Sequence, residues 1–118
     1  MIDITGAITT CADKVVIESL FDNLDVEEIE TTDNGNHIFE ISGILSGYGY
    51  KLFTTGLVSI ANKIAGGCFE CAYPCFGEEN DFWKIEFDAK NNEWFVYNGY
   101  RAYETSGSRL KFMAEGDE

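Results

Sequence analysis

The chain is poor in the residues that linkers and nucleic-acid-binding surfaces need. Among its 118 residues there are one proline, one histidine and 8 lysines and arginines. A single proline argues against an extended proline-rich linker, and so few bases leave no basic groove for nucleic acid. No apolar run reaches the length of a membrane span, and the segment from Met1 shows no basic stretch ahead of an apolar one. The sequence therefore predicts a cytoplasmic protein that contacts neither a membrane nor nucleic acid directly.

Acidic residues, in contrast, are abundant. Asp and Glu number 21, which gives a formal net charge of −13, and residues 1–47 hold ten acids against one base. A folded body this acidic attracts basic proteins. Because 45% of the residues are hydrophobic and 14% are aromatic, the chain is not a disordered acidic tail. We predict a single domain over residues 1–114 and a flexible acidic tail at 115–118.

Hydrophobic periodicity predicts an alternation of strands and helices in the first part of the chain. Thr10 would cap the first helix, Asn34-Gly35 would form a hairpin turn, and Gly66-Gly67 would end the second helix. The predicted elements are strand 2–8, helix 12–24, strands 26–32 and 37–45, a break at 47–50, and helix 53–64.

The rest of the chain alternates as an antiparallel meander does. Its predicted strands are 83–88, 93–97, 100–105 and 110–113, and Ser106–Ser108 leads to the last of them. We therefore predict an α+β fold. It would have a ferredoxin-like βαββα core with two helices packed on the sheet, and an added C-terminal antiparallel β-meander.

The densest acidic run lies at the first hairpin. Along a regular strand, Glu28 and Glu30 project from one face and Glu27 from the other. Two-residue steps of about 6.6–7 Å resemble the separation of phosphates along a DNA strand, roughly 7 Å through space. Such a surface would occupy the Lys/Arg groove of a nucleic-acid-binding protein. The alternative is a solvated edge strand whose charges prevent aggregation. The candidate binding residues are Asp25, Glu27, Glu28, Glu30 and Asp33, with Glu78, Glu79 and Asp81 as a second patch.

Aromatic residues are too numerous to fit on one strand face. Trp83, Ile85 and Phe87 are predicted to be core residues because they alternate with charged residues. Tyr97 and Tyr100 are predicted to contribute to a protein interface, where large rigid side chains anchor a partner. A homodimer through the same aromatic face is an equal alternative.

Cys68, Cys71 and Cys75 form the sharpest local pattern. Two cysteines separated by two residues can hold one zinc ion, with Cys75 as a third ligand. No second pair follows, so we favour the alternative that these are buried, small apolar residues, and we predict no cofactor. The single histidine, His37, has no serine or cysteine partner visible in the sequence, and no catalytic motif occurs. We therefore predict that the protein is not an enzyme.

In size, acidity and compact α+β layout, the chain resembles small single-domain inhibitors encoded by phages and other mobile elements, anti-CRISPR proteins among them. The resemblance implies that carboxylates dock on the DNA-binding or guide-binding surface of a target in the host cytoplasm. We therefore expect an acidic inhibitor that binds and blocks a basic, nucleic-acid-binding protein. A small Cys-ligated zinc module or a homo-oligomeric structural module is the alternative.

Overall fold

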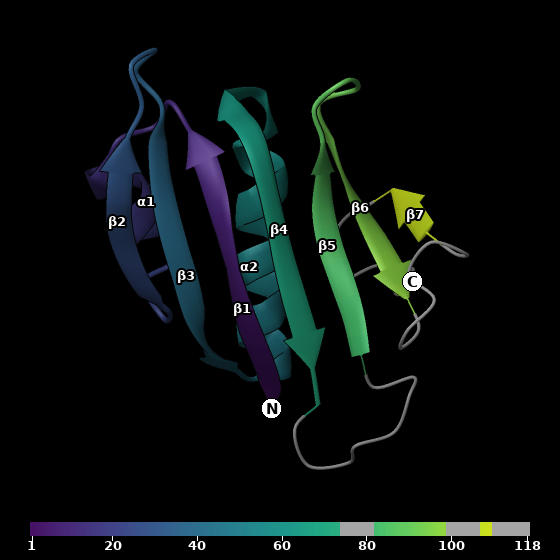
Figure 1. Ribbon diagram of the computed structural model, residues 1–118. Helices are drawn as coiled ribbons and strands as arrows, with labels where there is room; N and C mark the ends of the chain where they lie inside the picture. Colours follow the sequence, from purple (N-terminus) through teal and green to yellow (C-terminus); the bar gives the residue numbers. More distant parts are fainter. Residues whose placement is uncertain (74–81, 99–106, 110–118) are drawn as a thin grey trace.

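The computed structural model of the protein describes residues 1–73, 82–98 and 107–109. These residues form one antiparallel sheet of seven strands, two α-helices and a short 3-10 helix (Figure 1). The strands are β1 (Ile2–Thr10), β2 (Asp25–Thr31), β3 (His37–Leu45), β4 (Ile64–Ala72), β5 (Phe82–Asp88), β6 (Glu93–Asn98) and β7 (Gly107–Arg109). The helices are α1 (Lys14–Leu20), α2 (Gly47–Ser59) and the 3-10 helix η1 (Ala61–Lys63).

The strands of the sheet follow the order β2-β3-β1-β4-β5-β6-β7, and every neighbouring pair is antiparallel. This confirms the predicted α+β class with two helices and an antiparallel sheet. The order of the full sheet is not that of a four-stranded ferredoxin-like sheet, because β5, β6 and β7 continue it beyond β4. The ferredoxin-like core stays a prediction. In the described sheet, β1 is internal and β2 forms one edge.

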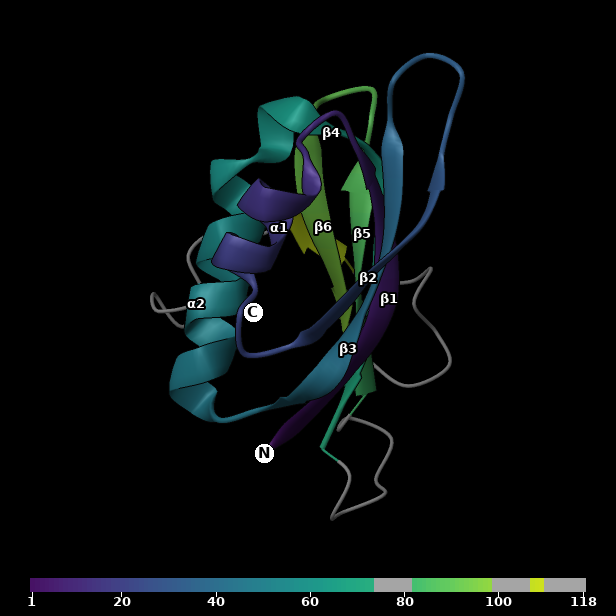
Figure 2. The same cartoon turned by 90° about the vertical axis from the view of Figure 1, so that its left-hand side faces the viewer.

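Both helices lie against the same face of the sheet (Figure 2). Alternate residues of each strand point to that face, as the two-residue period of a strand requires. In β1 these are Ile2, Ile4 and Ile8, and all three are buried. The other strands contribute Phe39, Ile41, Leu45, Phe69, Cys71, Trp83, Ile85, Phe87, Trp94 and Val96 to the same core. The predicted alternation of the strand at 83–87 is therefore confirmed.

Two tryptophans of the sheet hold α2 in place. The Trp83 indole Nε1 donates a hydrogen bond to the Tyr50 hydroxyl at 2.8 Å. The Trp94 indole Nε1 donates to the Leu57 backbone oxygen at 2.9 Å. Both bonds are buried, where an unpaired indole N–H would be costly. They therefore set the position of α2 along the strands.

The first helix is shorter than the predicted span 12–24, and Thr10 is not its N-cap. Asp13 caps α1, because its carboxylate accepts a hydrogen bond from the Val16 N–H at 3.2 Å. Thr10 is buried at the end of β1, and its hydroxyl donates to the Lys63 backbone oxygen at 2.6 Å. Thr10 thus ties β1 to η1.

The second helix begins earlier than predicted. Ser46 caps it by accepting from the Gly49 N–H at 3.0 Å, so the predicted break at 47–50 is the first turn of α2. Gly66-Gly67, predicted to end the helix, lies inside β4. A Cβ on the second of these glycines would stand 2.9 Å from the Trp94 ring. The glycine therefore leaves room for the indole.

The C-terminal strands follow the prediction in part. β5 and β6 match the predicted strands 83–88 and 93–97. Gly107–Arg109, predicted in part as the segment that leads to the last strand, forms β7 and pairs with β6. Outside the described residues lie the predicted strands 100–105 and 110–113 and the predicted tail 115–118.

Candidate functional site

In the described part of the chain, no helix covers the face of the sheet opposite α1 and α2 (Figure 2). We call it the open face. Residues directly opposite each other in antiparallel strands project to the same face, so the strand register identifies its members. Its exposed carboxylates are Asp3, Asp25, Glu27, Glu30, Glu40, Glu70 and Glu86. Lys84 is the one base among the side chains described on this face.

A β-bulge in β2 changes which residues reach the open face. Glu27 lies opposite Glu40, and Glu30 lies opposite Ile38. The register shifts between these pairs, which leaves Ile29 as the extra residue of the ladder. The two partners on β3, Ile38 and Glu40, are two residues apart and therefore share a face. Because of the bulge, Glu30 projects to the same face as Glu27.

The bulge therefore aligns three carboxylates of β2 on the open face. Asp25, Glu27 and Glu30 follow one another at about 6.6–7 Å, the two-residue step of a strand. The prediction that Glu28 and Glu30 share a face is wrong, because it assumed a regular strand. Glu28 lies opposite Phe39 and projects to the helix side.

Glu40 adds a fourth carboxylate directly beside this row. Its Cβ and that of Glu27 are separated by about 4.5–5.5 Å, the distance between opposed residues in an antiparallel pair. Like charges in that position destabilise a sheet. We call Asp25, Glu27, Glu30 and Glu40 the acidic edge.

The other half of the open face, on β5 and β6, carries charges of both signs and aromatic rings. Lys84 Nζ lies 3.4 Å from a Glu86 carboxylate oxygen and 5.6 Å from the centre of the Tyr97 ring. The ring of Phe95 stands 6.1 Å from that of Tyr97, and both side chains are half-buried. The negative charge of the open face is therefore least compensated at the acidic edge.

Asp33, another candidate for partner binding, does not join the acidic edge. Asp33 lies in the turn between β2 and β3, where Gly35 has a φ of +89°. Outside the described residues lie Glu78, Glu79, Asp81 and Tyr100.

His37 has a partner that the sequence did not reveal. Its Nδ1 lies 2.7 Å from a Glu28 carboxylate oxygen, which also accepts a hydrogen bond from the Thr31 hydroxyl at 2.9 Å. The hydrogen bond from His37, followed by that from Thr31, holds the pKa of Glu28 below its ordinary value of 4.5. Glu28 and His37 are nine residues apart, and the hairpin register brings them together on the helix side. This cluster stabilises the hairpin and is separate from the acidic edge.

Glu28 is expected to make the protein sensitive to acid. Its lowered pKa means that it contributes stability above about pH 4.5, and this contribution is lost as the pH falls through the folded-state value. When the pH is lowered from about 6 to about 3.5, the free energy of unfolding should therefore fall less in Glu28→Gln than in the wild type. Urea unfolding at both pH values measures the difference. Glu30→Gln, which removes a carboxylate from the opposite face of β2, is the control. An equal acid loss in wild type and Glu28→Gln would contradict the assignment.

The two cysteines of β4 do not point toward a common site. Cys68 and Cys71 are three residues apart in a strand, so their side chains point to opposite faces. Cys71 is buried in the core and Cys68 is half-buried on the open face, and burial raises the pKa of both thiols. The two cannot hold one ion from this strand, which is evidence against the zinc alternative. Cys75 lies outside the described residues, and among those described no three potential ligands form a metal-binding group.

Neither α1 nor α2, the helices of the described part of the chain, is long and apolar enough to cross a bilayer. Comparison with protein-family models, curated proteins and solved structures gave no match.

Proposed function

We propose that this protein is an acidic inhibitor that docks its open face on a basic, nucleic-acid-binding protein and blocks it. The acidic edge carries the proposal. It presents Asp25, Glu27 and Glu30 in a row with a step close to the separation of phosphates along a DNA strand, roughly 7 Å through space. The proposal places the protein in the host cytoplasm, among the small inhibitors of phages and mobile elements that it resembles.

The opposed pair Glu27 and Glu40 supports binding over solubility alone. A surface that serves only solubility intersperses both signs of charge, and a small domain needs a net charge of only about 2–8 for that purpose. Here the net charge is −13, and two carboxylates stand face to face at a cost to stability. Such a cost is expected where the charge density itself has a use.

Protection of an edge strand is the competing explanation. β2 forms an edge of the described sheet, and acids and bulges both discourage edge-to-edge pairing. This explanation accounts for charge on β2. It does not account for Glu40 on β3, an internal strand of the described sheet. The homodimer alternative would use Phe95 and Tyr97, whose half-buried side chains leave a small aromatic surface.

The test is capture of partners from a bacterial lysate on the immobilised protein, followed by elution with rising salt. We expect a basic, nucleic-acid-binding protein that elutes only as salt screens the contact and that competing double-stranded DNA displaces. A captured protein that DNA does not displace would contradict mimicry. The absence of any basic protein in the eluate would contradict the proposal as a whole.

A further inference from the structure

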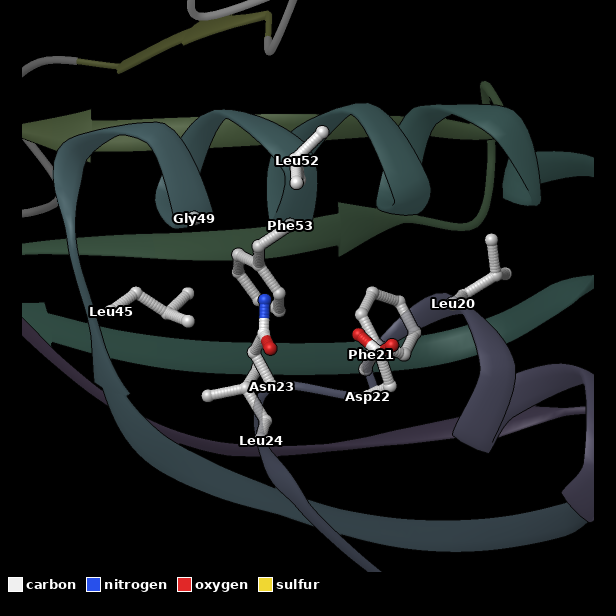
Figure 3. Close-up of a pocket in the computed structure, with 9 residues that line it drawn as sticks. All are labelled: Leu20, Phe21, Asp22, Asn23, Leu24, Leu45, Gly49, Leu52 and Phe53. Carbon is white, nitrogen blue, oxygen red and sulfur yellow. The ribbon is translucent and has the colours of Figure 1, made fainter.

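A second candidate surface lies on the helix side of the molecule. The segment from the end of α1 to β2 and the first half of α2 border a small, partly open hollow of about 40 Å³ (Figure 3). Its lining is mostly apolar. Phe21, Leu45 and Phe53 are buried, Leu24 is half-buried, and Leu52 on α2 remains 45% exposed.

Apolar surface continues from this hollow along both helices. Tyr48 lies one turn before Leu52 on α2 and is 68% exposed. Val16 lies one turn before Leu20, another lining residue, on α1 and is 37% exposed. An apolar hollow that extends into exposed apolar side chains is typical of a surface that receives a partner.

Acidic residues border the hollow on one side. Asp22 and Leu24 also line a neighbouring hollow, together with Glu18, Asp25 and Val26. Lys14 Nζ on α1 lies 3.9 Å from the Glu18 carboxylate, and the exposed Lys51 on α2 directly precedes Leu52. The rim therefore carries three carboxylates, those of Glu18, Asp22 and Asp25, against two lysines.

We infer that this hollow binds a basic amphipathic helix of a partner protein. An apolar side chain of the partner enters the hollow beside Leu24 and packs on the exposed Leu52, and its Lys or Arg residues lie against Asp22 and Glu18. Helices that dock in grooves use this combination of apolar anchors and flanking charges. The charge complementarity of the rim selects a basic helix over an acidic one. The site lies on the helix side of the sheet and does not depend on the proposed function of the open face.

The probe is a synthetic 18-residue peptide in which Leu and Lys are placed to form an amphipathic helix. A second peptide replaces every Leu by Ala, so that helix and charge are kept but the anchors are lost. We expect calorimetry at physiological salt to show at least about tenfold tighter binding of the Leu/Lys peptide, since burial of one Leu side chain accounts for that factor or more. Amide chemical shifts of Leu20, Leu24 and Gly49 should change on binding.

Three variants test where the peptide binds. Leu52→Gln should remove the advantage of the Leu/Lys peptide, while Ile44→Gln, which removes a side chain 54% exposed on the open face, should leave it unchanged. Asp22→Asn should weaken the binding of both peptides. Both apolar positions are exposed, and thermal unfolding confirms that each variant is folded. Equal affinity for the two peptides, or an equal effect of the two glutamine variants, would overturn the inference.

Discussion

Replacement of Gly6 by alanine is expected to destabilise the protein by about 3 kcal/mol or more, at or above the upper end of what overpacking costs. Gly6 lies in the middle of β1, on the helix side and beside Phe69 of β4. A Cβ there would stand 2.5 Å from the Phe69 ring and 2.7 Å from the Phe69 Cα, and would overlap the backbone oxygen of Cys68. Backbone atoms cannot turn aside as a side chain can, so β1 and β4 would have to separate. A small domain has about 5–15 kcal/mol in total, so this is a large fraction of its stability.

Gly66→Ala is the matched control. Gly66 lies in the same strand as Phe69, and a Cβ there meets no atom within 4 Å. Its unfolding free energy should change by no more than about 0.5 kcal/mol. Urea unfolding can be followed by the fluorescence of Trp83 and Trp94, both buried. If Gly6→Ala and Gly66→Ala had equal stabilities, the close approach of β1 and β4 would be wrong.

Glu40→Lys is expected to stabilise the protein and to abolish partner binding. It replaces a repulsive pair with Glu27 by an attractive one, for a gain of about 0.2–1 kcal/mol. A lysine in the acidic edge would face the basic surface of the partner, where a like charge costs several kcal/mol. The affinity should therefore fall by at least about a hundredfold. Thermal unfolding measures the first effect, and titration of the captured partner measures the second.

Asp33→Lys separates local docking from net charge. It makes the same change of charge at an exposed residue of the turn between β2 and β3, outside the acidic edge. We expect it to weaken binding far less than Glu40→Lys does. Equal losses of affinity would mean that total charge attracts the partner and that the acidic edge has no special part. A loss of stability in Glu40→Lys would show that the Glu27–Glu40 opposition is not repulsive.

The sequence by itself determined those elements whose signals are local. The two-residue period of Trp83, Ile85 and Phe87 specified which side of that strand is buried, because burial on one face imposes the alternation directly. The hairpin followed from Asn34-Gly35, since Gly35 supplies the positive φ that the turn needs. Net charge and the shortage of bases likewise needed no structure.

The sequence-based predictions were wrong at glycines whose role depends on packing against residues far away in the sequence. Residues 47–50 were predicted to break the chain, yet they form the first turn of α2, where Tyr50 accepts the hydrogen bond from Trp83. Gly66-Gly67 was predicted to end a helix, yet both residues lie in β4, where Gly67 leaves room for the Trp94 ring. In both cases packing against the sheet outweighed the intrinsic preference of the residues.

Only the tertiary structure decided which carboxylates act together. The bulge at Ile29 moves Glu30 to the side of Glu27 and leaves Glu28 on the other, where it meets His37. Glu40 joins the acidic edge through pairing with β2, and in the described part of the chain the open face carries no helix because α1 and α2 both lie on the other side of the sheet (Figure 2). Strand register and layer arrangement depend on pairings between residues far apart in the chain. A strand period read along the sequence shows which residues share a face, but it identifies neither the neighbouring strand nor the position of a bulge.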